Sequence, residues 1–422
     1  MLSRFNYILY KILGVYIIFG SLFVKSIYAI PLSRIELVVF FVLTIMCFFR
    51  GQNSFPTNEN KFIIGIFYLY LLFAGLSLIG TPLRGKNTGL VAYMQYLFLP
   101  LYIYIFLNFS SLTKKKITDY LRYIVYLAVM WTFVNTFLYF FELPIWEEHQ
   151  QWIGRISNGY PTVDVVCLNY TLFILLFLDN LGIGKIRRLF STFIIIIGII
   201  SQFSGTGTAI LFVMIFSFIL SSLKKEKQKL KWNFYISLVS VFLFLLTGFA
   251  YFYAQQPELT KYAMSVITKK ISFFVGEDNV ESEWNSFDQD TMEVREEEFE
   301  IQKRKHLTSL SNRVFGVGFK NVTTYSSFNS KDIFIEDQYG MNLVTIGYIG
   351  SFLFVLFVIS PLKRWIKFYK PDKYAIVIGC LPVFFYLLSS KTTLTMVTMQ
   401  IELIFALFYS ILLYPSKFAQ SF

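Results

Sequence analysis

The sequence predicts an all-α protein that crosses a membrane many times, and three observations carry this prediction. Of its 422 residues, 55% are hydrophobic and 15% charged, and the mean hydropathy is +0.57. A soluble globule of this length could not cover so much apolar surface. Apolar runs of about 18 or more residues recur along the chain, each long enough to cross a hydrocarbon core of roughly 30 Å as a helix. Basic residues gather in the short connections between these runs, as is typical of helical membrane proteins.

We expect about twelve transmembrane helices, one for each apolar run. They cover approximately 8–24, 32–49, 61–80, 88–108, 117–141, 163–181, 186–203, 205–222, 232–253, 339–361, 374–390 and 394–414. The first run is interpreted as a retained span because no small-residue cleavage site follows it. The chain therefore divides into residues 1–253 with nine spans, one large loop over 254–338, and residues 339–422 with three spans.

The basic residues predict the orientation of the chain. They concentrate in the even-numbered connections, for example at 114–116 in the fourth and at 363–373 in the tenth. The positive-inside rule places these connections in the cytoplasm, together with both termini, and places the loop 254–338 in the periplasm. Within that loop, Thr291–Leu310 is expected to be a helix, because good helix formers dominate, with acidic residues early and basic residues late.

The remaining composition excludes several classes of protein. The net charge of +12 would suggest nucleic acid as the partner of a soluble protein, but here the connections account for it and no nucleic-acid motif is present. The cysteines, Cys47, Cys167 and Cys380, lie in apolar runs and are interpreted as packing residues. Neither His149 nor His306 has a metal-ligand partner at i+3 or i+4, and no zinc, P-loop or Ser-His-Asp motif is found. We therefore expect no metal and no other cofactor.

Polar groups suited to chemistry cluster where the long loop returns to the membrane. Arg313 precedes a Gly-x-Gly turn at Gly316 and Gly318, and Glu336 and Asp337 stand just before the next span. A guanidinium binds phosphate oxygens through two parallel hydrogen bonds, and a carboxylate in a partly dry site can act as a general base. We interpret Arg313, Glu336 and Asp337 as catalytic candidates, with the two glycines as part of the substrate site. The alternatives are a surface arginine and a carboxylate that only caps the following helix.

Further substrate-binding candidates lie in or next to other outward segments. Arg155 stands beside a rigid turn that contains Tyr160, just before the sixth span. It is either an anion clamp or an interfacial arginine that extends to lipid headgroups. Arg84, Tyr339 and Lys391 are also predicted to contact substrate, although the interfacial interpretation of Lys391 is the simpler one.

Several short motifs resemble those of the Wzy-type O-antigen polymerases and the related O-antigen ligases. They are R-V-F-G-V-G from Arg313, the helix pattern of Leu343, Gly347 and Gly350, and the segments S-G-T-G-T-A-I-L and R-I-S-N-G-Y-P-T-V-D. Many spans and one large periplasmic loop also match that family. The ligases carry a histidine where this chain has E-D-Q-Y from Glu336, which favours the polymerases. The SEDS peptidoglycan polymerases match less well.

The resemblance implies a GT-C-like glycosyltransferase of the bacterial inner membrane, with its active site facing the periplasm. It would move a growing glycan from one undecaprenyl-diphosphate carrier to a sugar hydroxyl of the next carrier-linked repeat unit, without a metal. Arginines would stabilise the diphosphate leaving group, and a carboxylate would activate the hydroxyl. The implied partners are undecaprenyl-diphosphate-linked glycans, membrane lipids and a chain-length regulator protein, with no nucleic acid.

Three other functions stay open at this point. The first is an O-antigen ligase, which would transfer the glycan to a lipid anchor. The second is a lipid-linked oligosaccharide flippase or other transporter, although transporters usually place charged sites near the membrane midplane. The third is a membrane scaffold whose long loop binds a partner. In this chain the polar candidates lie at the outer edge of the spans, which favours the enzymes.

Overall fold

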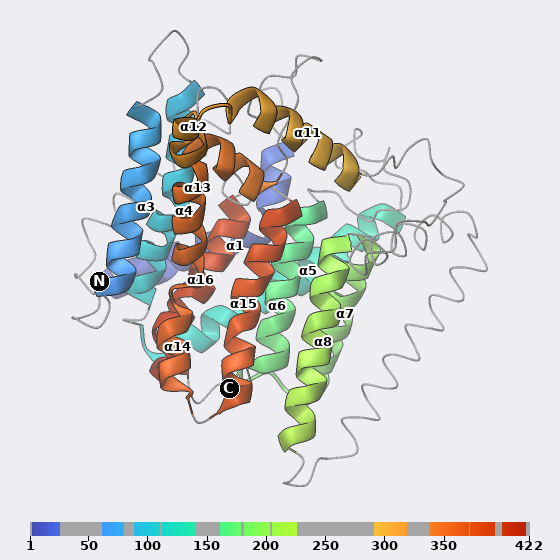
Figure 1. Cartoon of the computed structure of the whole chain (residues 1–422). Helices are drawn as coiled ribbons and strands as arrows, with labels where there is room; N and C mark the ends of the chain where they lie inside the picture. Colours follow the sequence, from blue (N-terminus) through green and yellow to red (C-terminus); the bar gives the residue numbers. More distant parts are fainter. Residues whose placement is uncertain are drawn as a thin grey trace. The chain divides into compact units, whose positions relative to one another are not determined.

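The computed structural model is helical, and every regular element in the residues that it describes is an α-helix (Figure 1). It describes residues 2–25, 61–79, 88–109, 112–140, 161–178, 181–202, 205–225, 291–318, 337–370, 372–392 and 399–418. Two helical stretches, Gln338–Phe368 and Tyr374–Lys391, are long and apolar enough to cross a membrane.

Ten of the twelve predicted spans coincide with helices. They are α1 (Leu2–Lys25), α3 (Lys61–Ile79), α4 (Thr88–Phe109), α5 (Lys114–Phe140), α6 (Pro161–Phe177), α7 (Lys185–Ser201), α8 (Gly205–Lys225), α13 (Gln338–Ile359), α15 (Lys373–Thr392) and α16 (Met399–Leu413). The predicted spans 32–49 and 232–253 lie outside the described residues. The helix boundaries agree with the apolar runs to within several residues, because an apolar run keeps water from its own backbone and a helix pairs that backbone within one segment.

The helices belong to two compact units, each assembled from segments that are distant in sequence. Unit 1 contains Met1–Leu13, Ala29–Ile117 and Asp288–Gln420. Unit 2 contains Gly14–Tyr28, Thr118–Phe287 and Ser421–Phe422. Unit 1 therefore brings helices from the N-terminal part of the chain together with the helices that follow the long loop.

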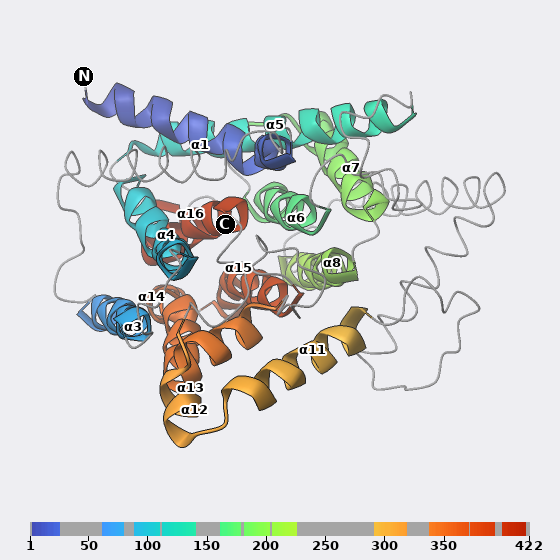
Figure 2. The ribbon, with the colours of Figure 1, turned by 90° about the horizontal axis from the view of Figure 1, so that it is seen from above.

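Aromatic side chains hold the helices of unit 1 together. Tyr70 of α3 stacks on Phe357 of α13, with ring centroids 5.7 Å apart, and Tyr386 of α15 stacks on Phe405 of α16 at 4.0 Å. All four side chains are almost completely buried. Figure 2 shows α3, α4, α15 and α16 nearly along their axes, so they run roughly parallel or antiparallel to one another. Such stacked pairs add to the stabilisation from apolar burial.

A short helix, α14 (Leu362–Phe368), closes the turn between α13 and α15. The buried indole of Trp365 donates a hydrogen bond to the carbonyl of Ala375 (2.7 Å), which fixes α14 to the start of α15. Gly379 leaves room for this indole, since a Cβ there would lie 2.0 Å from its nitrogen. The one-turn helix α17 (Pro415–Phe418) follows α16.

The predicted loop helix over Thr291–Leu310 is present but shorter than expected. It ends at His306 as α11 (Thr291–His306), and a second helix, α12 (Leu310–Phe315), begins after a turn. Ser309 causes this division, because its side chain accepts a hydrogen bond from the backbone N–H of Asn312 (3.1 Å) and so caps α12. Figures 1 and 2 show that α11 runs across the axes of the long helices of unit 1.

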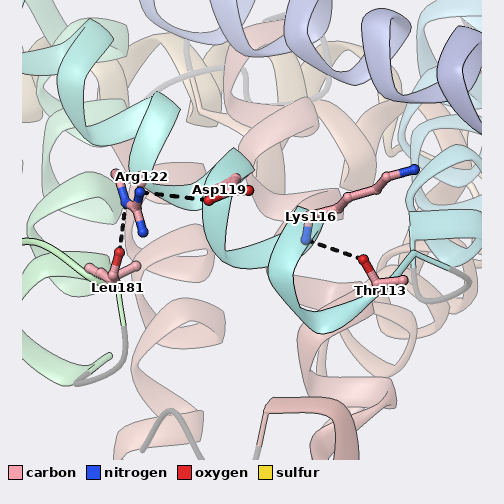
Figure 3. A network of polar contacts seen from close by, with 5 residues as sticks. All are labelled: Thr113, Lys116, Asp119, Arg122 and Leu181. Atoms are coloured by element: carbon pink, nitrogen blue, oxygen red, sulfur yellow. Dashed lines mark hydrogen bonds and ion pairs between the residues drawn. The ribbon is translucent and has the colours of Figure 1, made fainter.

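In unit 2, two arginines donate hydrogen bonds to backbone carbonyls, one after the end of α6 and one in its last turn. Arg122 of α5 donates to the carbonyl of Leu181 (2.8 Å) and lies 3.6 Å from Asp119, as Figure 3 shows. Arg188 of α7 donates to the carbonyl of Leu175 (2.7 Å). The last carbonyls of a helix have no partner within it, and cations are favoured at that end of the helix dipole. Figure 3 also shows the first turn of α5, which belongs to unit 1, where the side chain of Thr113 accepts a hydrogen bond from the backbone N–H of Lys116 (3.4 Å).

Candidate active site

The helix α13 is broken at Gly347. This residue has φ 70° and ψ −172°, a conformation that is essentially restricted to glycine. The ring of Tyr339 lies 6.5 Å from that of Phe354, whereas an unbroken helix would separate the two residues by about 22 Å. The predicted continuous span over 339–361 is therefore two helical segments that meet at a sharp bend, because Gly347 interrupts the helical backbone.

The Gly-x-Gly turn after α12 docks on this break. The backbone N–H of Val317 donates to the carbonyl of Val344 (2.8 Å), and the N–H of Gly318 donates to the carbonyl of Thr345 (3.0 Å). In a continuous helix these two carbonyls would accept from residues 348 and 349. The turn thus supplies hydrogen bonds that the break removes, which matters because an unpaired buried carbonyl is costly.

Two glycines make this backbone contact possible. A Cβ at Gly316 would lie 2.3 Å from the carbonyl oxygen of Thr345, and a Cβ at Gly347 would lie 2.4 Å from that of Val314. Gly316, with φ 77° and ψ 178°, shares the glycine-restricted conformation of Gly347. The Gly-x-Gly turn and the helix pattern that contains Gly347, which are separate motifs in the sequence, therefore meet in one structural contact. Close packing accounts for Gly316, and a positive φ of 82° accounts for Gly318. The predicted role of both glycines in substrate binding stays a prediction.

Arg313 is presented at the surface of α12, close to this contact. Its side chain is exposed, and its Nε donates to the carbonyl of Leu307 (3.0 Å). No carboxylate among the described residues forms an ion pair with Arg313, and its other guanidinium nitrogens have no hydrogen-bond partner there. One hydrogen bond thus orients the guanidinium and leaves its remaining N–H groups available to an anion, while the predicted role of Arg313 in anion binding stays a prediction.

Asp337 caps α13. Its Oδ1 accepts a hydrogen bond from the backbone N–H of Gly340 (2.7 Å), and the residue is buried. This is the capping role that the sequence analysis gave as the alternative to catalysis. The cap also fixes the direction of the carboxylate, so a role as general base stays a prediction that the structure leaves open.

Of the other predicted site residues, two lie within the described part of the chain and four lie outside it. Tyr339 donates its hydroxyl to the carbonyl of Leu387 (2.8 Å), which joins the start of α13 to the end of α15. Lys391 is exposed in the last turn of α15. The remaining four lie outside the described residues: Arg84, Arg155, Tyr160 and Glu336.

Sequence reasoning missed a buried polar face on the first segment of α13. Gln338, Asn342 and Thr345 are all almost completely buried, and they lie at i, i+4 and i+7, on one side of the helix. The side-chain amide of Gln338 donates to the Oδ1 of Asn342 (2.8 Å), while the Nδ2 of Asn342 has no partner among the described residues. The helical spacing of three polar residues in an apolar run was the available signal.

Glu402 is a second group that the sequence analysis overlooked, since it placed the polar candidates at the outer edge of the spans. It lies in α16, its side chain is 0% exposed, and neither carboxyl oxygen forms a hydrogen bond with a described residue. The backbone of Leu99 in α4 faces the carboxyl group without meeting hydrogen-bond geometry. An acidic residue inside an apolar run was the signal, because such residues are rare in spans and usually functional.

We expect position 402 to tolerate an uncharged side chain of the same shape but no unpaired charge. Glu402→Gln should keep the free energy of unfolding within about 1 kcal/mol, whereas Glu402→Lys should lower it by about 3–5 kcal/mol. Ser416→Lys, at an exposed position of α17, is the matched control and should change it by less than about 0.5 kcal/mol. Thermal unfolding of the detergent-solubilised variants measures this. Equal stability of the two lysine variants would contradict the burial of Glu402.

No protein-family model matches this chain, and no curated protein is significantly similar to it. Within the described ranges, no three His, Cys, Asp or Glu side chains are grouped as metal ligands. The function is therefore inferred from the residues and their arrangement.

Proposed function

We propose that the protein is a twelve-span membrane glycosyltransferase that polymerises undecaprenyl-diphosphate-linked repeat units of a surface polysaccharide at the periplasmic face of the inner membrane. The observation that carries the proposal is the guanidinium of Arg313, oriented by one hydrogen bond and otherwise unpaired among the described residues, beside a broken apolar helix. Broken helices in membrane proteins often mark substrate sites, and a lipid diphosphate is an anion held at the membrane boundary.

Contacts within unit 1 support the predicted topology. The Lys116 ammonium lies 5.9 Å from the ring centroid of Tyr7, so the start of α5 is beside the start of α1. The Arg364 guanidinium lies 5.2 Å from the ring of Tyr414, so the connection between α13 and α15 is beside the end of α16. Each pair joins two segments that the positive-inside rule assigns to the same side of the membrane.

The proposed reaction has two chemical requirements. The acceptor sugar hydroxyl attacks the anomeric carbon of the growing glycan, the bond from that carbon to the phosphate oxygen breaks, and undecaprenyl diphosphate leaves. Arg313 would stabilise the negative charge that develops on the diphosphate. Glu336 or Asp337 would take the proton of the attacking hydroxyl. Arg155 would contact the same diphosphate from the predicted outward connection before the sixth span.

Deletion of the gene followed by gel electrophoresis of the surface polysaccharide tests this function. Loss of a polymerase leaves single repeat units on the lipid anchor. Loss of a ligase leaves the bare anchor, and loss of a flippase leaves no repeat unit at the surface. Single repeat units are the expected result, and either of the other two patterns would replace the polymerase by the corresponding alternative.

Elongation by the purified enzyme is expected to continue in the presence of EDTA. The reason is that arginine side chains can neutralise a diphosphate without a metal ion. The measurement is the length distribution of glycans made from lipid-linked repeat units with and without the chelator. A loss of elongation in EDTA that magnesium or manganese restores would contradict metal-independent catalysis.

A further inference from the structure

A cationic and apolar surface lies at the junction of α11 and α12. Arg304 and Lys305 are exposed at the end of α11, and Leu310 and Phe315 are exposed on α12 by 78% and 52%. We call these four residues the junction surface. Because α12 has only six residues, it is too short to cross a membrane. Its exposed apolar side chains are therefore not explained as part of a membrane-spanning helix.

The two cations of this surface have no acidic partner among the residues that the structure describes. Among the described residues, neither Arg304 nor Lys305 forms an ion pair, whereas the neighbouring Lys303 is paired with Glu300. Burial, together with the charge of Lys305, lowers the pKa of His306, which favours the neutral imidazole, so the positive charge of this surface is assigned to Arg304 and Lys305. Two adjacent cations therefore remain available to an anionic partner.

The depth of the surface follows from what α12 is attached to. Phe315 stacks on Phe73 of α3 with ring centroids 6.1 Å apart, and Phe73 lies six residues before Ile79, the last residue of α3. The contact is therefore about 9 Å from the end of that apolar helix. Segments that lie in a membrane interface bury their apolar side chains about 5–10 Å into the boundary between headgroups and acyl chains.

We infer that the junction surface docks on the bilayer, with Leu310 among the acyl chains and with Arg304 and Lys305 bound to the headgroups of anionic phospholipids. The chemistry favours lipid over a protein partner, because exposed cations next to large exposed apolar residues at this depth match an anionic membrane surface. The contact would hold the α12 turn, and with it the break in α13, at a fixed level in the membrane.

Fluorescence quenching by brominated lipids tests the inference on the full chain. A bimane label is placed by Leu310→Cys in a background with Cys47, Cys167 and Cys380 replaced by alanine, and the protein is reconstituted in nanodiscs. We expect brominated acyl chains to quench this label several-fold more than a label at Thr308→Cys, which is also exposed but polar. Equal and weak quenching at both positions would overturn the docking of Leu310.

The headgroup contact is tested by comparing brominated phosphatidylglycerol with brominated phosphatidylcholine. Phosphatidylglycerol should quench the Leu310 label at a lower mole fraction than phosphatidylcholine does. Each cation should contribute a factor of roughly five to this preference, so the double variant Arg304→Gln with Lys305→Gln should remove it. Arg304→Lys keeps the charge and should keep the preference. A preference unchanged in the double glutamine variant would overturn the inference. The measurement requires no glycan synthesis, so its failure and a failure of the proposed enzymatic function are distinguishable.

Discussion

Replacing Gly347 by alanine is expected to lower the free energy of unfolding by about 4 kcal/mol or more. The residue occupies backbone angles that side-chain-bearing residues avoid, and the new Cβ would lie 2.4 Å from the carbonyl oxygen of Val314. Relief of that overlap would separate the turn after α12 from the break and leave the carbonyls of Val344 and Thr345 unpaired. Thermal unfolding and the monodispersity of the solubilised protein measure the effect.

The companion variants make this prediction specific. Gly316→Ala should be about as harmful as Gly347→Ala, and the double variant should cost little more than either one, because the two glycines serve one contact. The control is Gly65→Ala in α3, where a Cβ meets nothing within 4 Å, and it should be neutral or stabilise by up to about 1 kcal/mol. Full additivity of the two harmful substitutions would contradict a shared contact.

Arg313→Lys is expected to reduce chain elongation by roughly 100-fold or more, and Arg313→Ala by at least as much. Lysine keeps the charge but lacks the planar fork that binds two phosphate oxygens at once. Protein level and unfolding should stay close to those of the parent, since the side chain is exposed and contributes one hydrogen bond to the fold. The measurement is the rate of glycan elongation by the purified enzyme.

Two further variants complete the test of the arginine clamp. Arg155→Lys should impair elongation as Arg313→Lys does, because both arginines are proposed to hold the same diphosphate. Arg304→Lys, an exposed arginine of α11, is the control and should retain elongation to within about two-fold. Polysaccharide of normal length from both the Arg313 and Arg155 lysine variants, at normal protein level, would remove the clamp and leave the two arginines as interfacial residues.

The helices were predictable from the sequence because their main determinant is local. A long apolar run must satisfy its own backbone hydrogen bonds wherever water is excluded, and only a helix does so within one segment. The runs 61–80 and 88–108 therefore became α3 and α4 almost residue for residue. The loop helix was predicted with the correct start but the wrong end. The reason is that a single serine at position 309 is a weaker signal in the sequence than the helix-forming residues on either side of it.

The site was less predictable, because its residues act through neighbours that the sequence does not identify. The Gly-x-Gly turn and the glycine at 347 were visible as separate patterns, but only packing shows that one covers the break in the other. Likewise, Asp337 was visible as a carboxylate before an apolar helix, and the bond to the N–H of Gly340 decided that it caps α13.

The sequence alone determined the composition of the protein, the position of most helices and the presence of an arginine next to a glycine turn. These properties depend on residue type and on spacing along the chain, which are local quantities. Only the tertiary structure decided that α13 bends at Gly347, that Glu402 is enclosed in a helical core, and that Arg313 has one backbone partner within the described part of the chain. Each of these depends on atoms brought together from distant segments, and contacts between distant segments leave no periodic mark in a single sequence.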